Sequence, residues 1–195
     1  SSDLMNQALK LDAGARRSAR IALGYDATNL YAAFDVTDDS PLKNQGGDPA
    51  MLFKTGDSVN LYLAADPKAD PQRKTPVAGD MRLLATVVDD KPVVVLYEPV
   101  IARDARREPK IFSSPTGSLE FDRVRVLESA KVAWKRSPTG YVLVLSVPLN
   151  ELSLKLATGQ SIRGDAGVLF SNPGGTITSI RSDRKSTRLN SSHTV

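Results

Sequence analysis

Apolar and polar residues alternate, one by one, through most of this chain of 195 residues. Because successive side chains of a β-strand point to opposite faces, this alternation is typical of strands that bury one face. It is found in residues 19–25, 30–36, 59–63, 81–87, 93–97, 124–126, 132–134, 141–147 and 168–170, and residues 176–180 begin a further segment. Helical periodicity over more than two turns is absent, and the one helical turn that we expect follows Pro148, at residues 150–152. Strands that follow one another without helices between them predict antiparallel pairing.

The sequence therefore predicts an all-β fold, an antiparallel two-sheet β-sandwich of the immunoglobulin-like or jelly-roll-like kind. Hydrophobic residues make up 41% of the chain, enough for the core of one domain of this length. Three long polar stretches, residues 37–56, 66–80 and 102–118, are expected to be loops at the ends of the sandwich. Loops longer than about 12 residues are often functional, so a binding site is expected among them.

Composition disfavours several classes of protein. The chain has no cysteine, which excludes a disulfide framework and a thiolate metal site. No apolar run approaches the roughly 20 residues that cross a bilayer, so no membrane span is expected. The chain begins at Ser1 without a basic-then-apolar leader, and we expect it to be the interior of a longer product.

The end of the chain differs in character from the rest. The segment that begins at Asp183 and ends at His193 reads DRKSTRLNSSH, which resembles one reading frame of a common sequencing-library adapter. We therefore expect residues 183–195 to be an artefactual, disordered tail, and residues 1–182 to be a sandwich that is truncated at its C-terminus. The tail carries a net charge of +2 out of the chain's +4, which leaves +2 for the domain. Nucleic-acid binding, which relies on a strongly basic surface, is not expected.

Three segments together resemble a known family. Residues 29–39 read NLYAAFDVTDD, residues 56–66 read GDSVNLYLAAD, and residues 140–149 read GYVLVLSVPL. Their order and spacing resemble the family 9 carbohydrate-binding modules and the related DOMON-like domains, over residues 9–182. The resemblance implies a two-sheet sandwich without catalytic residues that binds an oligo- or polysaccharide. It also implies a module tethered to other domains of a larger protein, in an extracellular or periplasmic location.

The resemblance also indicates site residues. The family holds a sugar end between two aromatic rings, since the axial hydrogens of a sugar stack on a ring while its hydroxyls need fixed polar partners. Phe53 is near the position of one of these rings, and Arg82 matches an arginine that contacts sugar hydroxyls. Amide positions of the family's site fall near Leu84 and Leu169, and the second ring lies beyond residue 182. Asn44 and Lys54 are in the same loop region and either meet the ligand or neutralise nearby acidic residues.

Other interpretations of these residues stay open. In the alternative, Phe53 is a plug at the open end of a structural or protein-interaction sandwich, and Arg82 is paired to a surface carboxylate. Trp134 alternates with Val132, which favours packing against the core over a sugar platform. Acidic residues near strand ends offer the oxygen ligands that calcium prefers, although without the spacing of a known calcium loop; they are Asp35, Asp38, Asp39, Asp48 and Asp57.

An enzyme is the least favoured alternative. The only histidine, His193, lies in the tail, so serine or cysteine nucleophiles lack their usual base. A pair of carboxylates, as in a glycoside hydrolase, remains an option because 21 Asp and Glu residues precede the tail. We expect no catalytic residues and no metal ligands.

Overall fold

The structure is a computed structural model that describes residues 8–12, 14, 16–103, 105–114, 117–152, 154, 162–172 and 177–181. The predicted tail that begins at Asp183 lies outside the described residues, and so does the truncation that it implies. Thirteen strands and one short 3-10 helix are described: β1 (Leu9–Asp12), β2 (Ser18–Tyr25), β3 (Asn29–Thr37), η1 (Pro49–Lys54), β4 (Ser58–Ala64), β5 (Asp80–Val88), β6 (Lys91–Glu98), β7 (Lys110–Ser114), β8 (Gly117–Phe121), β9 (Arg123–Val126), β10 (Lys131–Ser137), β11 (Gly140–Pro148), β12 (Arg163–Ser171) and β13 (Ile177–Arg181).

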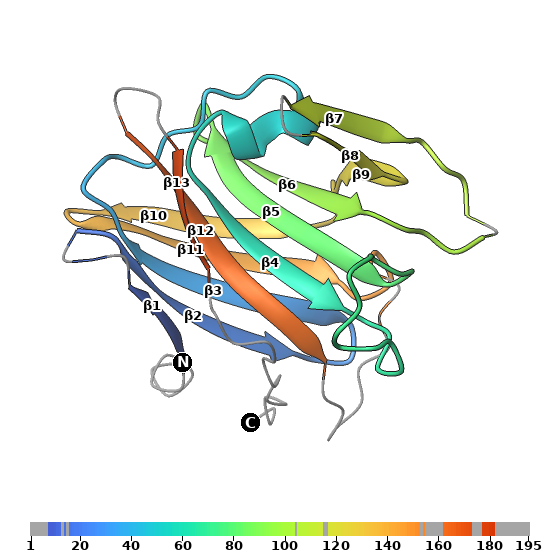
Figure 1. Cartoon of the computed structure of the whole chain (residues 1–195). Helices are drawn as coiled ribbons and strands as arrows, with labels where there is room; N and C mark the ends of the chain where they lie inside the picture. Colours follow the sequence, from blue (N-terminus) through green and yellow to red (C-terminus); the bar gives the residue numbers. More distant parts are fainter. Residues whose placement is uncertain are drawn as a thin grey trace.

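Two antiparallel sheets face each other, which confirms the predicted β-sandwich (Figure 1). The five-stranded sheet has the order β1-β2-β3-β11-β10, and the six-stranded sheet has the order β13-β12-β4-β5-β6-β9. The strands β7 and β8 form a separate hairpin. Within the described part of the chain, no helix is long and apolar enough to cross a membrane.

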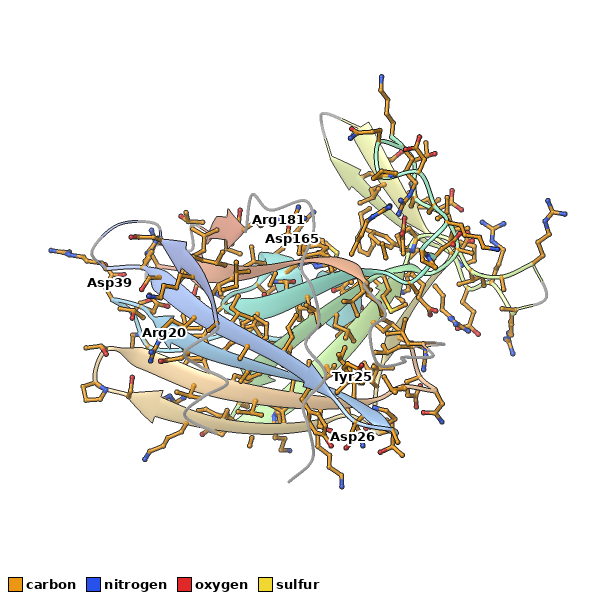
Figure 2. All side chains as sticks on the ribbon, turned by 90° about the horizontal axis from the view of Figure 1, so that it is seen from below. Arg20, Tyr25, Asp26, Asp39, Asp165 and Arg181 are labelled. Atoms are coloured by element: carbon orange, nitrogen blue, oxygen red, sulfur yellow. The ribbon has the colours of Figure 1, made fainter. Side chains whose placement is uncertain are left out.

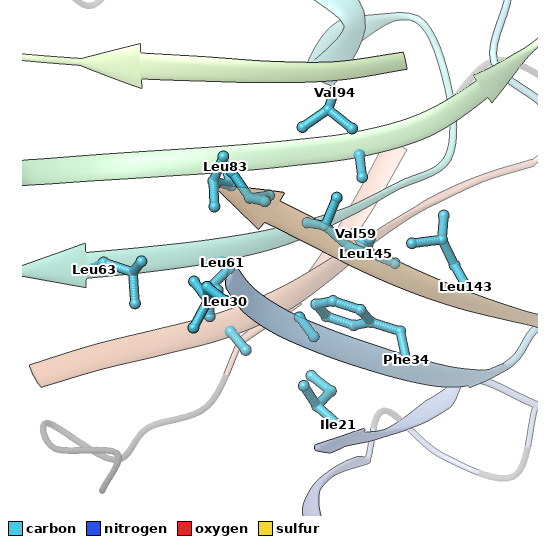
Figure 3. Packing of buried hydrophobic residues seen from close by; sticks show 14 of the residues in the cluster. Ile21, Leu30, Phe34, Val59, Leu61, Leu63, Leu83, Val94, Leu143 and Leu145 are labelled. Atoms are coloured by element: carbon cyan, nitrogen blue, oxygen red, sulfur yellow. The ribbon is translucent and has the colours of Figure 1, made fainter. Parts of the chain in front are cut away.

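The main core lies between the two sheets and uses the inward positions of the alternating segments. Figure 3 shows Phe34 and Leu145 from the five-stranded sheet against Leu61 and Leu83 from the six-stranded sheet. All four side chains are at most 2% exposed. Trp134 is partly buried against this core, which confirms its predicted packing role.

Two of the three predicted loops contain secondary structure. Residues 37–56 include η1, which begins after Asp48; this side chain caps the helix by accepting a hydrogen bond from the Ala50 N–H at 2.9 Å. Residues 102–118 include β7 and the start of β8. Neither element was predicted, because each is short and packs Leu52, Phe53, Phe112 and Phe121 in a second apolar cluster outside the main core. The expected turn after Pro148 is present, with the Glu151 N–H bonded to the Pro148 carbonyl at 3.1 Å.

Asp38 is an acidic residue that directly follows β3 and is buried, with only 5% of its surface exposed. One carboxylate oxygen accepts hydrogen bonds from the N–H and hydroxyl of Ser40, both at 3.0 Å. The other oxygen is buried without a hydrogen-bond partner among the described residues, as is the hydroxyl of Tyr141. Burial raises the pKa of the Asp38 carboxyl above its ordinary value, against the opposing effect of the Ser40 hydrogen bonds.

Asp38→Asn is expected to stabilise the protein at neutral pH. Because the folded-state pKa is raised, the wild-type protein loses stability as the pH rises from the unfolded value of about 3.8 through the folded value. An amide cannot ionise, so the variant should gain about 1 kcal/mol or more at pH 7 and progressively less toward acid. Urea unfolding over this pH range measures the difference. Asp89→Asn, which removes one acidic group at an exposed turn position with positive φ that Asn tolerates, is the control and should leave the stability at pH 7 close to that of the wild type. If the free energies of unfolding of Asp38→Asn and the wild type differ by the same amount at every pH, ionisation of Asp38 does not destabilise the folded protein and this prediction is wrong.

Candidate functional site

A row of directly opposed residues crosses the outer face of the six-stranded sheet, the face turned away from the main core. From β12 to β9 the register places side by side Asp165, Tyr62, Arg82, Tyr97 and Val124. We call these residues the Arg82 row. Cross-strand neighbours have Cβ atoms about 5 Å apart, so the row brings charged, aromatic and apolar side chains into contact.

A groove of about 710 Å³ lies over one half of this face. Its floor includes Tyr62 and the small side chain of Ala64, which the register places between Arg163 and Asp80. Leu119 and Phe121 of the hairpin contribute to the lining. The loop that precedes β5 contributes Pro71, Arg73, Lys74, Thr75 and Pro76, and the strands add Arg82, Asp165 and Arg181. The groove is therefore open, built on the sheet, and lined by both polar and apolar side chains.

Arg82 is held at the centre of the row by polar and aromatic contacts. Its Nε and Nη2 both donate to Oδ1 of Asn60, at 2.9 and 2.7 Å. Its guanidinium carbon lies 5.2, 5.6 and 5.1 Å from the ring centroids of Phe53, Tyr62 and Tyr97. These are cation–π distances. Asn60 is a neutral partner, so the contact fixes the orientation of the guanidinium without neutralising its charge.

Arg181 reaches the groove from the edge strand β13. Its register partner on β12 is Gly167, and a side chain at Gly167 would approach the Cγ of Arg181 to 3.0 Å. The glycine therefore lets Arg181 fold across β12, where its guanidinium carbon lies 4.1 Å from the Tyr62 ring centroid. Nη2 of Arg181 also pairs with Oδ2 of Asp165 at 2.8 Å, and Figure 2 shows these two residues together.

The other half of the outer face is covered by η1 and the β7–β8 hairpin. Four rings form edge-to-face contacts there, Phe53 with Tyr97 and Phe112, and Phe121 with the same two rings, at centroid distances of 5.6 to 6.2 Å. Tyr97 is fully buried and donates its hydroxyl to the Ala50 carbonyl at 3.1 Å. Burial raises the pKa of Tyr97 to about 12, so this tyrosine is a neutral donor. The cluster forms a rigid wall beside the groove.

Asp57 ties the loop before β4 to the end of β12. Its Oδ2 accepts from the Lys43 N–H at 2.7 Å, and its Oδ1 accepts from the N–H and hydroxyl of Ser171 at 2.5 and 2.9 Å. Burial raises the pKa of the Asp57 carboxyl, and these hydrogen bonds act in the opposite direction. The side chain thereby connects the segment that carries η1 to the sheet that carries the groove.

The four predicted ligand-binding residues occupy three different places. Phe53 and Arg82 are in contact, as the resemblance implies, although Phe53 belongs to the wall and not to the lining of the groove. Lys54 is exposed, lies 5.7 Å from the Phe53 ring centroid, and lines a second hollow of about 320 Å³ near Lys43 and Asn172. Asn44 is buried, and its amide bonds the carbonyls of Leu52 and Asp57. These contacts assign Asn44 to the support of the loop around η1.

Other groove residues were not identified from the sequence. Tyr62 and Asn60 occupy outward positions of β4, which the alternation indicates, but only the register places them beside Arg82. Arg163 and Arg181 had no sequence signal of their own. Leu84, near an amide position of the family, is fully buried in the cluster under η1, where a polar side chain would need a partner.

The acidic residues considered for calcium perform separate tasks. Asp35 pairs with Arg20, Asp39 pairs with Arg17, and Asp48 caps η1. In the portion that the structure describes, no three His, Cys, Asp or Glu residues are grouped as a metal site requires. The two carboxylates of the groove, Asp80 and Asp165, lie on strands separated by β4, and each pairs with an arginine.

Comparisons with known proteins agree with this architecture. No protein-family model matches the sequence, and neither does any curated protein. Two solved structures of a family 9 carbohydrate-binding module from Caldicellulosiruptor kristjanssonii do match. The glucose complex has a TM-score of 0.52 and 16% identity, over 92% of this chain and 75% of that chain. The cellotriose complex has a TM-score of 0.53 and 17% identity, over 92% and 74% of the two chains. This chain therefore shares the fold of a family 9 carbohydrate-binding module, as the resemblance implied.

Proposed function

We propose that the chain binds a carbohydrate without transforming it, in the groove beside the Arg82 row. The observation that carries this proposal is the fixed guanidinium of Arg82, held among three aromatic rings at the side of an open groove. The shared fold adds support, because the similar structures hold glucose and cellotriose.

The chemistry of the groove suits a saccharide. Leu119 is exposed and, with the parts of Tyr62 and Phe121 that line the groove, offers apolar surface to a sugar ring. Asn60 uses two of the five donors of Arg82, which leaves three for hydroxyl groups. Because the row lies on paired strands, these groups are positioned before the ligand arrives, which lowers the entropic cost of binding.

The biological setting is also part of the proposal. A groove of this size holds a short stretch of saccharide and includes no facing pair of free carboxylates among the described residues, which fits a recognition module better than a hydrolase. We infer that the module serves a larger protein outside the cytoplasm, tethered to other domains, as the family resemblance implies. Of the four predicted residues, Arg82 contacts the ligand in this proposal and Phe53 orients Arg82 from the wall, whereas Lys54 lines the second hollow and Asn44 supports the loop around η1.

The double variant Phe53→Ala, Arg82→Ala is expected to lose saccharide binding. It removes the donors of Arg82 and the ring that orients them, which should weaken binding by about 2 kcal/mol or more, a loss of at least about 30-fold. A glycan array followed by calorimetry on the saccharides that bind measures the effect. Arg82→Lys separates charge from geometry, since it keeps the positive charge and loses the planar fork.

Arg136→Ala is the matched control. Arg136 lies 5.0 Å from the Trp134 ring centroid on the five-stranded sheet, so it has the same arginine–aromatic chemistry away from the groove. Arg136→Ala should bind the same saccharides with the affinity of the wild type. Melting temperatures of all variants show whether each one is folded. Absence of binding to any glycan by the wild-type chain would favour the structural or protein-interaction sandwich. Release of smaller sugars from a bound saccharide would favour the hydrolase.

A further inference from the structure

The groove contains more positive than negative charge. Five cationic side chains line it, from Arg73, Lys74, Arg82, Arg163 and Arg181, against the two carboxylates of Asp80 and Asp165. Both carboxylates are already used, because Asp80 pairs with Arg73 at 2.5 Å and Asp165 pairs with Arg181 at 2.8 Å. The remaining three cations leave the groove with a net charge of +3.

Two of these three cations have only neutral partners among the described residues. Arg82 donates to the amide oxygen of Asn60, and Arg163 donates to the backbone carbonyl of Ala69 at 2.7 Å. Arg82 is also packed against three rings, which exclude water from part of its guanidinium. A partly desolvated cation interacts more strongly with an anion than an exposed cation does. A site for a neutral sugar has no need of this excess charge.

The register places these two arginines on opposite sides of the groove floor. Arg163 is opposite Ala64, and Arg82 is opposite Tyr62, the outward residue that precedes Ala64 on β4. The strands β12 and β5 are two inter-strand spacings apart, about 10 Å, with β4 between them. Long side chains from both strands can therefore approach one ligand that lies over Tyr62 and Ala64.

We propose that the saccharide bound in this groove is acidic, with a carboxylate, as in a uronic acid, that Arg82 and Arg163 receive. This inference rests on the proposed function and specifies its ligand class. The planar guanidinium of Arg82 donates to a carboxylate through the N–H groups that Asn60 leaves free. Arg163 adds a second charge-assisted contact, while Tyr62 lines the groove beside the sugar.

The test compares acidic polysaccharides with their own carboxyl-reduced products, which keep the linkages and lose only the charge. Suitable pairs are polygalacturonate, alginate and a glucuronic-acid polymer, each beside its reduced form, with cello-oligosaccharides and a sulfated polysaccharide as further probes. At least one acidic member should bind about tenfold or more tightly than its reduced counterpart by calorimetry. The preference should decrease as the salt concentration rises, because charge interactions near a surface are screened.

The outcomes distinguish the proposal that the groove binds a carbohydrate from the inference that this carbohydrate is acidic. Equal or tighter binding of the reduced saccharides would overturn the acidic-ligand inference and leave carbohydrate binding supported. Binding of the sulfated polymer without any uronate would overturn the carboxylate assignment. Absence of binding to every acidic and neutral saccharide would overturn the proposed function as well.

Asn60→Asp is the sharpest variant. It keeps the shape of the side chain and gives Arg82 a carboxylate partner within the protein, at the position where Asn60 accepts two hydrogen bonds. The internal carboxylate should compete with that of the ligand, so the ratio of acidic to neutral affinity should fall about tenfold. Arg163→Gln should lower the same ratio by removing the second charge.

Arg20→Gln provides the matched control for charge. Arg20 pairs with Asp35 on the outer face of the five-stranded sheet, away from the groove (Figure 2), and its replacement should leave the ratio unchanged. A ratio that does not respond to Asn60→Asp or to Arg163→Gln, in variants with wild-type melting temperatures, would overturn the inference.

Discussion

The register of β4 is the constraint on which both the core and the groove depend. β4 lies inside the six-stranded sheet, between β12 and β5, and turns Leu61 and Leu63 toward the main core. The same register turns Asn60 and Tyr62 outward, beside Arg82. A slip of one residue would exchange the two faces and would move the apolar side chains into the groove. Asp57 opposes such a slip, because its carboxylate connects the segment before β4 to β12.

The second apolar cluster explains why only half of the outer face is a groove. The hairpin and η1 cover β6 and β9 with a set of packed rings, while Tyr62 and Ala64 of β4 and part of β12 stay partly exposed in the groove. Arg82 lies at the boundary between the two halves. It contacts the wall through Phe53 and Tyr97, and it contacts the polar half through Asn60. This position orients a charged group at a surface and also removes part of its water, which is the arrangement that the proposed ligand contact needs.

The sequence predicted the sandwich because its physical signal is local. A period of two can be observed in any strand without knowledge of its neighbours, and the inward positions of β3, β4, β5 and β11 were all identified correctly. The hairpin and η1 were missed, because Leu52, Phe112 and Phe121 pack in the second cluster, which forms only when these segments fold over the outer face of the sheet. Arg82 and Phe53 were predicted as site residues through the resemblance, and the structure places them in contact. Arg181 could not be found, because its path to Tyr62 depends on pairing with Gly167 across strands.

Chemical-shift mapping with a bound saccharide would test the central claim most directly, because it reports the location of the ligand independently of its affinity. If the groove holds the ligand, the amide shifts should cluster on β4, β5 and β12 around Asn60, Tyr62 and Arg82, and extend to Leu119 on the hairpin. Shifts that instead cluster on the outer face of the five-stranded sheet, around Val142 and Val144, would contradict it.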